Sequence, residues 1–199
     1  MLDKRPYRES ALLTSGLSPD YGKMSFVIYG AQKLSEKNFP AADLFRELEV
    51  EFEDDGNVAK ELYTAKNIDL ITNFDAIAEN TKAFTMATRI GSFLLKNSVA
   101  GVPQPYTYDT LRSVLANLAQ LDCGHPPWTL MQSSVILKTA HLYENGLLPE
   151  PRSTEQSDFL ENLVASGIDN SDLPACPEQY WNSLNCWLNS LIEYHQLKR

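Results

Sequence analysis

The chain has 199 residues, of which 43% are hydrophobic and 22% are charged, and its formal net charge is -9 at pH 7. This length and composition predict a folded protein of one or two domains. They exclude a chain that crosses a membrane as a helix, because no stretch approaches the ~18 consecutive apolar residues that a span needs. The charged residues 1–8 have no apolar segment behind them, so we expect a soluble, cytoplasmic protein.

Residues 1–74 are predicted to form a small β domain. The runs 10–16 and 23–30 have strand character, and Pro19 and Gly22 between them are turn residues, so the two runs should form a hairpin. In the run 44–54 apolar residues alternate with charged ones, which predicts a half-buried strand with a solvated acidic face, Glu47 included. After a turn signal at 54–57, the run 58–71 should return as the next strand.

Beyond Asn73 the apolar residues recur with the period of a helix. We expect Asp75 to be the N-cap of a helix that runs to about Asn97, and Thr107 to cap a second helix. The inward residues of the first helix should be Ile77, Phe84, Ala87, Ile90, Phe93 and Leu94. Those of the second should be Leu111, Val114, Leu115, Leu118 and Leu121.

The rest of the chain is also predicted to be helical. The run 128–146 is apolar almost all round and should lie in the middle of a bundle. A short helix over 157–166 should end at Gly167, and Pro177 should open the last helix. The predicted fold class is therefore α+β, with an OB-fold-like small β-barrel over residues 1–74 followed by an α-helical domain over residues 75–199.

No group of residues has the pattern of a catalytic or metal site. The cysteines are odd in number and contain no C-x-x-C pair, so we expect buried free thiols; they are Cys123, Cys176 and Cys186. The histidines are scattered over a loop, a helix and a tail; they are His125, His141 and His195. The sequence has no phosphate-binding loop, nucleophile elbow or H-E-x-x-H motif. We expect no catalytic residue, no metal and no cofactor, and an enzyme is the least favoured class.

Charge is distributed unevenly along the chain. Residues 1–38 carry six Lys or Arg against four acids, whereas residues 39–199 carry 11 against 22. A polyanion should therefore meet the amino-terminal end. Loops of small barrels hold phosphates and stack bases on aromatic rings, so the predicted DNA-binding residues are Lys4, Arg5, Arg8, Lys23, Lys33, Lys37, Tyr21 and Tyr29, with Tyr7 a further platform. We expect these cations to form one patch. The alternative is ordinary surface charge with half-buried strand tyrosines.

Three short motifs occur in a fixed order at the start of the chain. Residues 5–9 read R-P-Y-R-E, residues 18–23 read S-P-D-Y-G-K and residues 30–33 read G-A-Q-K, with hydrophobic strands between them. This order resembles the start of the RecO family, bacterial recombination mediator proteins. The run 44–54 resembles the family's next strand, and the run 134–151 resembles a helix that ends in L-x-x-x-G-x-x-P.

The resemblance implies a non-enzymatic role in recombinational DNA repair. Family members bind single- and double-stranded DNA, anneal complementary strands, and act with RecR and the single-stranded DNA-binding protein to load the recombinase. The alternative is a degenerate member that acts only as a protein-interaction module, which the acidic residues 39–199 and Gln32, in place of a basic residue, favour. Residues 147–175 contain no cysteine where the family often has a zinc module. The chain begins at what resembles the end of the family's first strand, so either the barrel is incomplete or the start codon lies downstream of the true one, and the sequence does not decide between the two.

Overall fold

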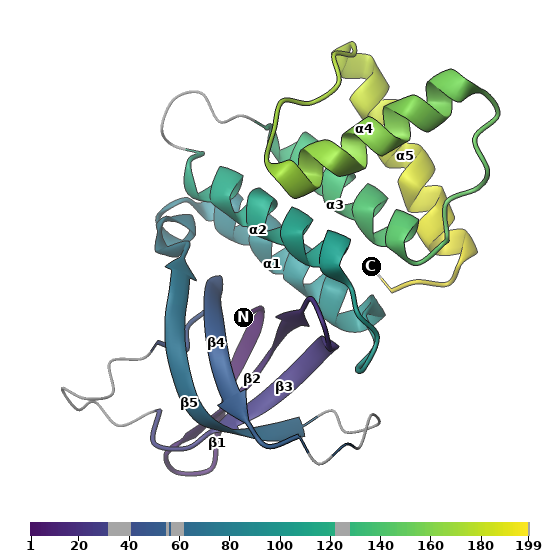
Figure 1. Cartoon of the computed structure of the whole chain (residues 1–199). Helices are drawn as coiled ribbons and strands as arrows, with labels where there is room; N and C mark the ends of the chain where they lie inside the picture. Colours follow the sequence, from purple (N-terminus) through teal and green to yellow (C-terminus); the bar gives the residue numbers. More distant parts are fainter. Residues whose placement is uncertain (32–40, 55, 57–61, 122–127, 199) are drawn as a thin grey trace.

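The computed structural model describes residues 1–31, 41–54, 56, 62–121 and 128–198 (Figure 1). A five-stranded sheet is followed by a short 3-10 helix and five α-helices, so the predicted α+β class is confirmed. The strands are β1 (Asp3–Tyr7), β2 (Ala11–Ser18), β3 (Gly22–Ile28), β4 (Arg46–Phe52) and β5 (Leu62–Asn73). They lie in the order β1-β2-β3-β5-β4, and only β3 and β5 run parallel.

The predicted hairpin is confirmed, because β2 and β3 pair antiparallel from Leu12 and Ile28 to Ser18 and Gly22. The two edges of the sheet also meet. The Met1 amino group donates to Arg46 O at 2.5 Å, and Phe45 N donates to Met1 O at 2.9 Å. These bonds satisfy backbone groups that an open edge would leave unpaired, and they curl the sheet into a barrel.

The alternation predicted for β4 is confirmed from Leu48 to Phe52 but not for Arg46 and Glu47, whose side chains are largely buried. Leu48, Val50 and Phe52 are half-buried, whereas Glu49 and Glu51 are exposed. The Glu47 side chain, predicted to be solvated, is only 9% exposed. The prediction is wrong because the pairing of β4 with β5 shifts register between Glu47 and Leu48, and α2 (Pro105–Ala119) supplies hydrogen-bond donors to this carboxylate.

The helical part begins with a cap other than the predicted one. Asp75 opens the 3-10 helix η1 (Asp75–Glu79), and its carboxylate accepts from Arg46 Nε at 2.9 Å and Nη2 at 2.7 Å. The cap of α1 (Thr81–Asn97) is Asn80, whose Oδ1 accepts from Lys82 N and Ala83 N. A distant arginine thus removes Asp75 from the capping role.

Two further predictions about the first two helices are wrong. Phe84 is exposed, because its ring covers Phe45 edge to face at 5.7 Å from outside the core. Thr107 is buried inside α2, which already begins at Pro105. The first N–H groups of α2 need no threonine cap, because the Glu144 carboxylate accepts from Tyr106 N at 2.8 Å and Thr107 N at 3.0 Å.

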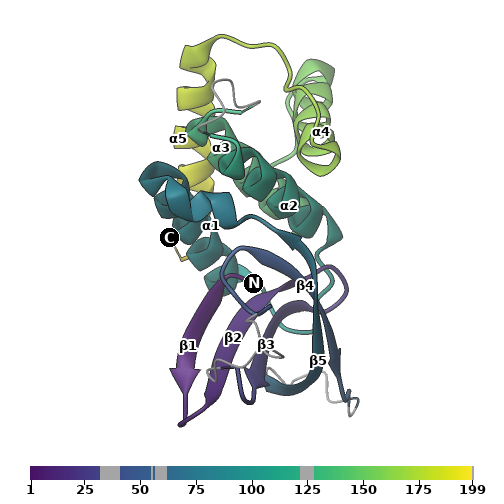
Figure 2. The same cartoon turned by 90° about the vertical axis from the view of Figure 1, so that its left-hand side faces the viewer.

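The all-round apolar helix is central, as predicted. α3 (Leu130–Glu144) packs against α1, α2, α4 (Thr154–Asp169) and α5 (Glu178–Tyr194) (Figures 1 and 2). Its start is fixed by a capping box between Thr129 and Gln132. A helix with four helical neighbours buries most of its surface, which explains why the sequence shows no broad polar stripe there.

α4 is longer than predicted and does not end at Gly167. Ser153 caps its start, and Asn170, in the left-handed conformation, ends it. Gly167 lies inside the helix, where a Cβ would meet Ile136 Cγ2 at 2.7 Å and Thr110 Cγ2 at 3.0 Å. The glycine therefore serves the close approach of α4 to α2 and α3.

The thiols that the structure describes are free, as predicted, but they are not buried. Cys176 is half-buried and Cys186 is exposed. Cys186 lies on the face of α5 opposite the buried Leu184 and Leu188, which explains its exposure. Cys123 is outside the described residues. Among the helices of the described ranges, none is long and apolar enough to cross a membrane.

Candidate nucleic-acid interface

Several of the predicted DNA-binding residues lie at one end of the barrel. We call it the distal end: Arg5, Tyr7, Arg8 and Tyr29, around the β1–β2 turn and just after β3. Tyr7 pairs with Ala11, and Leu12 pairs with Ile28, which brings the turn and the end of β3 to the same level of the sheet. The β1–β2 turn points away from the helices (Figure 2).

The distal end combines cations with two tyrosine rings, of which Tyr7 is half-buried and Tyr29 is exposed. Arg5 and Arg8 are exposed, and the Arg8 guanidinium lies over the Tyr7 ring, 5.2 Å from its centroid. Tyr29 is 59% exposed and therefore offers a ring face to solvent. Arginine next to exposed tyrosine is the combination that holds phosphates and stacks bases.

Tyr21 and Lys23 lie at the other end, against the helical part. Lys23 pairs with Leu17, five positions along β2 from the Leu12 level, which is roughly 17 Å. Its N–H donates to Val99 O at 3.3 Å, and its side chain is half-buried. Tyr21 is 37% exposed and packs edge to face on Phe52 at 5.7 Å. The prediction that all the cations form one patch is therefore wrong for Lys23, which lies at the opposite end of the barrel from Arg5 and Arg8.

Lys4 has its own anionic partner. Its ammonium group donates to the Asp43 carboxylate, just before β4. Burial alone would raise the pKa of Asp43, but hydrogen bonds from Lys4 and Leu44 N outweigh it, and the pKa is lowered. Asp43 therefore stays ionised and partly neutralises Lys4. Lys33 and Lys37 lie outside the described residues, so their placement stays a prediction.

The strands β4 and β5 carry the acidic side of the barrel. Glu49, Glu51, Glu53 and Asp69 are all exposed there. Glu53 is paired with Lys66 at 2.5 Å, and Asp69 accepts from Asn67 Nδ2 at 3.0 Å. These carboxylates make the β4–β5 side of the barrel negative.

A polar junction that the sequence analysis missed lies between β4 and α2. Glu47 Oε1 accepts from Tyr108 Oη at 3.0 Å and from Arg112 Nε at 2.8 Å. Burial and the negative charge of Glu47 raise the pKa of Tyr108, so the phenol stays protonated as a donor. Tyr108 and Arg112 are four residues apart on one face of α2, which is the signal that could have identified them as partners of an acidic strand.

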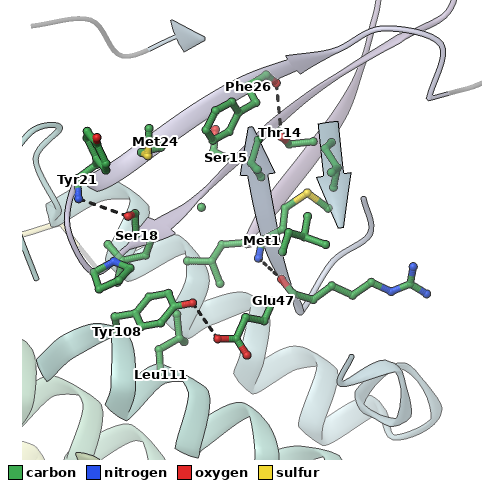
Figure 3. A pocket seen from close by; sticks show the side chains of 18 of the residues that line it. Met1, Thr14, Ser15, Ser18, Tyr21, Met24, Phe26, Glu47, Tyr108 and Leu111 are labelled. Carbon is green, nitrogen blue, oxygen red and sulfur yellow. Dashed lines mark hydrogen bonds between the residues drawn. The ribbon is translucent and has the colours of Figure 1, made fainter. Parts of the chain in front are cut away.

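Above this junction the barrel interior is hollow. A cavity of about 190 Å³ lies between β2, β3, β4 and α2. Figure 3 shows Tyr21, Met24 and Phe26 on its barrel side and Tyr108 and Leu111 on its helical side. The residues that face it are mostly apolar or aromatic, so the cavity suits a ligand with an apolar body.

Histidine and cysteine do not form a metal site in the described ranges, where no cluster of three or more potential ligands occurs. His141 is 1% exposed and packs edge to face on Phe93 at 5.3 Å, and burial lowers its pKa to about 4. His195 contacts Leu147 O at 2.9 Å through Nε2. Both histidines have structural surroundings; His125 and Cys123 lie outside the described residues.

Comparison with known proteins identifies the barrel. The family model described as Recombination protein O N terminal matches residues 1–74. No curated protein matches the chain. The matched residues contain all five described strands, whose OB-like arrangement agrees with the resemblance drawn from the sequence motifs. Residues 1–74 of this chain are therefore a RecO N-terminal domain.

Proposed function

We propose that the protein is a non-enzymatic mediator of recombinational DNA repair, which binds and anneals single-stranded DNA. The observation that carries the proposal is the RecO N-terminal domain over residues 1–74, a domain that implies DNA binding. Its role would be to hold two complementary strands close together on the protein surface, with no covalent bond made or broken.

The distal end is the proposed contact surface for the DNA backbone. Arg5 and Arg8 supply positive charge, and Tyr29 supplies an exposed ring. Lys33 and Lys37 follow Tyr29 closely in the sequence and are proposed to extend this surface. Each phosphate contact releases condensed counterions, so local cations can bind a strand even on a chain whose formal net charge is -9.

The partners proposed are RecR and the single-stranded DNA-binding protein. A groove of about 610 Å³ between α1, α3 and α5 supports the second partner. Its floor includes Phe93, Leu137 and Ile192, and the cations Arg89 and Lys138 line it. An apolar floor flanked by positive charge suits a peptide that is both acidic and apolar, and we infer that the acidic tail of the single-stranded DNA-binding protein docks there.

The DNA-binding proposal is tested by fluorescence anisotropy with labelled oligo(dT) at 50 and 200 mM salt. The unmodified chain should bind, and its affinity should fall steeply with salt. The double variant Lys33→Ala/Lys37→Ala should bind more weakly, and its salt slope should be smaller by about 0.7 for each phosphate that the variant no longer neutralises. The control Lys82→Ala/Arg152→Ala removes the same charge from exposed positions of the helical part and should leave the slope unchanged.

Absence of oligo(dT) binding even at 50 mM salt would refute the mediator proposal. If the chain then still captured RecR or the tail peptide of the single-stranded DNA-binding protein, the pure protein-interaction role would replace it. For the groove, Arg89→Ala should weaken binding of that tail peptide, whereas Lys82→Ala, one helical heptad away on the same helix, should not. Equal peptide binding by all three proteins would exclude the groove.

A further inference from the structure

We propose that the cavity between the barrel and α2 is a binding subsite for one unstacked pyrimidine base of single-stranded DNA. The inference rests on the proposed function and adds an interior subsite to the distal surface. The cavity measures about 190 Å³. An apolar cavity of about 150 Å³ in a protein core accepts a benzene ring, so the space here matches a single six-membered ring with its substituents.

Aromatic rings form the barrel wall of this space. Phe52 packs edge to face on Tyr21 at 5.7 Å and on Phe26 at 5.4 Å, and these three side chains line the cavity. They come from the β2–β3 turn, β3 and β4, so a planar group in the cavity would contact rings from three parts of the barrel. Figure 3 shows two of them, Tyr21 and Phe26. Contacts between bases and aromatic side chains are the main attraction in binding of single strands.

The charges at the cavity select an uncharged ligand. The acidic and basic groups that line it already have partners. Glu47 accepts from Arg112 and Tyr108, Arg46 is paired with Asp75, and the Met1 amino group donates to Arg46 O, so an ionic ligand finds no unpaired counter-charge among them. A cation gains little, because Arg112 already neutralises Glu47 and Tyr108 already donates to it. A nucleobase is uncharged, and an N–H on its edge can donate to the hydroxyl oxygen of Thr14, which lines the cavity and keeps acceptor capacity while it donates to Phe26 O.

The opening lies where a DNA strand could reach it. Among the lining residues only Tyr21 and Arg112 are exposed. Lys23, two residues after Tyr21, is a cation at this level of the barrel, so a phosphate next to an inserted base would find positive charge there. The sequence predicts that all cations form one patch, and Lys23 does not fit that prediction. A second subsite at the cavity would explain why Tyr21 and Lys23 lie away from the distal end.

The wall that carries Tyr21 is held in place by the helical part. The linker between α1 and α2 runs along the β2–β3 turn: Gly101 N donates to Tyr21 O at 2.8 Å, and Gln104 N donates to Pro19 O at 2.8 Å. Gly22 has a φ of 63°, and a Cβ there would lie 2.3 Å from Val102 O and 2.4 Å from Val99 O. The cavity is therefore preformed, which lowers the entropic cost of binding.

Photo-crosslinking tests the subsite directly on the unmodified chain. An oligo(dT) that contains 5-iododeoxyuridine is bound, irradiated, digested and analysed by mass spectrometry. We expect crosslinks on Phe26 or Phe52, inside the cavity, in addition to any on exposed tyrosines. Crosslinks confined to exposed residues such as Tyr29 would overturn the proposal, and this readout does not depend on the folding of any variant.

A filled cavity provides the second test. Leu48→Phe places extra volume in the space, whereas the control Leu70→Phe makes the same change on the neighbouring strand at a side chain that is 43% exposed and does not line the cavity. Leu48→Phe should keep its thermal unfolding midpoint, lose the interior crosslinks and bind oligo(dT) at least about five-fold more weakly, as expected when one base no longer stacks. Leu70→Phe should bind normally.

The outcomes separate this inference from the mediator proposal. If the unmodified chain binds oligo(dT) and Leu48→Phe binds equally well, the base subsite is wrong while the mediator proposal stands. If the unmodified chain binds no DNA, both are wrong. A Leu48→Phe variant that binds DNA normally but no longer binds RecR would identify the cavity as a site for a protein side chain and would likewise overturn the base subsite.

Discussion

The helical part and the barrel are packed in different ways. The largest fully buried side chains all belong to residues 75–199, and Trp128, Leu137 and Leu163 are among them. No large side chain of the described barrel residues is buried to that degree. Phe26, Leu48 and Phe52 instead stay half-buried beside a cavity. The comparison indicates that the helices supply most of the stability. The space left inside the barrel is the place where we propose that a base binds, and binding regions are commonly drawn from the less stable parts of proteins.

The largest expected difference is between core truncations in the two parts. Leu163→Ala removes a side chain with no solvent access in α4 and should lower the free energy of unfolding by about 2–5 kcal/mol. Leu48→Ala should cost less, because this side chain is half-buried and already borders empty space. Urea unfolding followed by circular dichroism measures both. Equal losses of stability would contradict the contrast in packing.

Acid should weaken the helical part through His141. Its folded pKa of about 4 lies below the ordinary value of 6.5, so the unfolded chain binds the proton more tightly. The stability that this group contributes is complete above pH 6.5 and is lost as the pH falls toward 4, on the order of 3 kcal/mol. Urea unfolding of the unmodified chain and of His141→Leu from pH 7 to 4 checks this. Parallel pH curves for the two proteins would rule out His141 as the cause.

The linker between α1 and α2 is hydrogen-bonded to the β2–β3 turn, and an added methyl group at Gly22 should disrupt this contact. Gly22→Ala places a Cβ against two backbone carbonyls, whereas Gly56→Ala, at a similar φ of 73°, meets nothing within 4 Å. Gly56→Ala should therefore cost about 1–2 kcal/mol, the backbone strain alone, and Gly22→Ala should cost more. Thermal unfolding compares them. A Gly22→Ala variant no less stable than Gly56→Ala would show that the turn is not held by the linker.

The smallest expected effect concerns a single charge. Asp43→Asn releases Lys4 from its ion pair, so affinity for oligo(dT) should rise about two-fold and the salt slope should steepen by about 0.7 for one additional neutralised phosphate. Asp69→Asn removes the same charge from the acidic side of the barrel, where its partner is Asn67, and should leave the slope unchanged. Anisotropy at several salt concentrations measures both. Identical slopes in the two variants would show that Lys4 does not become a DNA contact when Asp43 is neutralised.

Local patterns in the sequence predicted the parts of the fold that depend on local physics. The β2–β3 hairpin and the alternation of β4 follow from a period of two and a turn composition, and the central position of α3 follows from its lack of a polar face. The predictions failed where a distant residue intervenes. Arg46 removes Asp75 from its expected cap, and Glu144 replaces the cap expected from Thr107.

The candidate site was predictable to the same extent. The register of the hairpins brings Arg5, Arg8 and Tyr29 to one end of the barrel, as two consecutive hairpins require. The surroundings of Tyr21 and Lys23 were not predictable, because they depend on a linker some 80 residues away that returns to the β2–β3 turn. The cavity was not predictable either, since side-chain volumes in a sequence do not reveal how completely a barrel is filled.

The contacts between the α1–α2 linker and the barrel also determine which truncated fragment can retain the structure of the barrel. A fragment that stops at residue 74 keeps every strand but loses the backbone partners of Pro19, Tyr21 and Lys23, together with the Tyr108 and Arg112 donors to Glu47. In that fragment the Glu47 carboxylate, and the side of the cavity that α2 covers in the whole chain, would be exposed to bulk water. The smallest piece that behaves as the barrel does in the whole protein is therefore expected to extend through α2, to about residue 119.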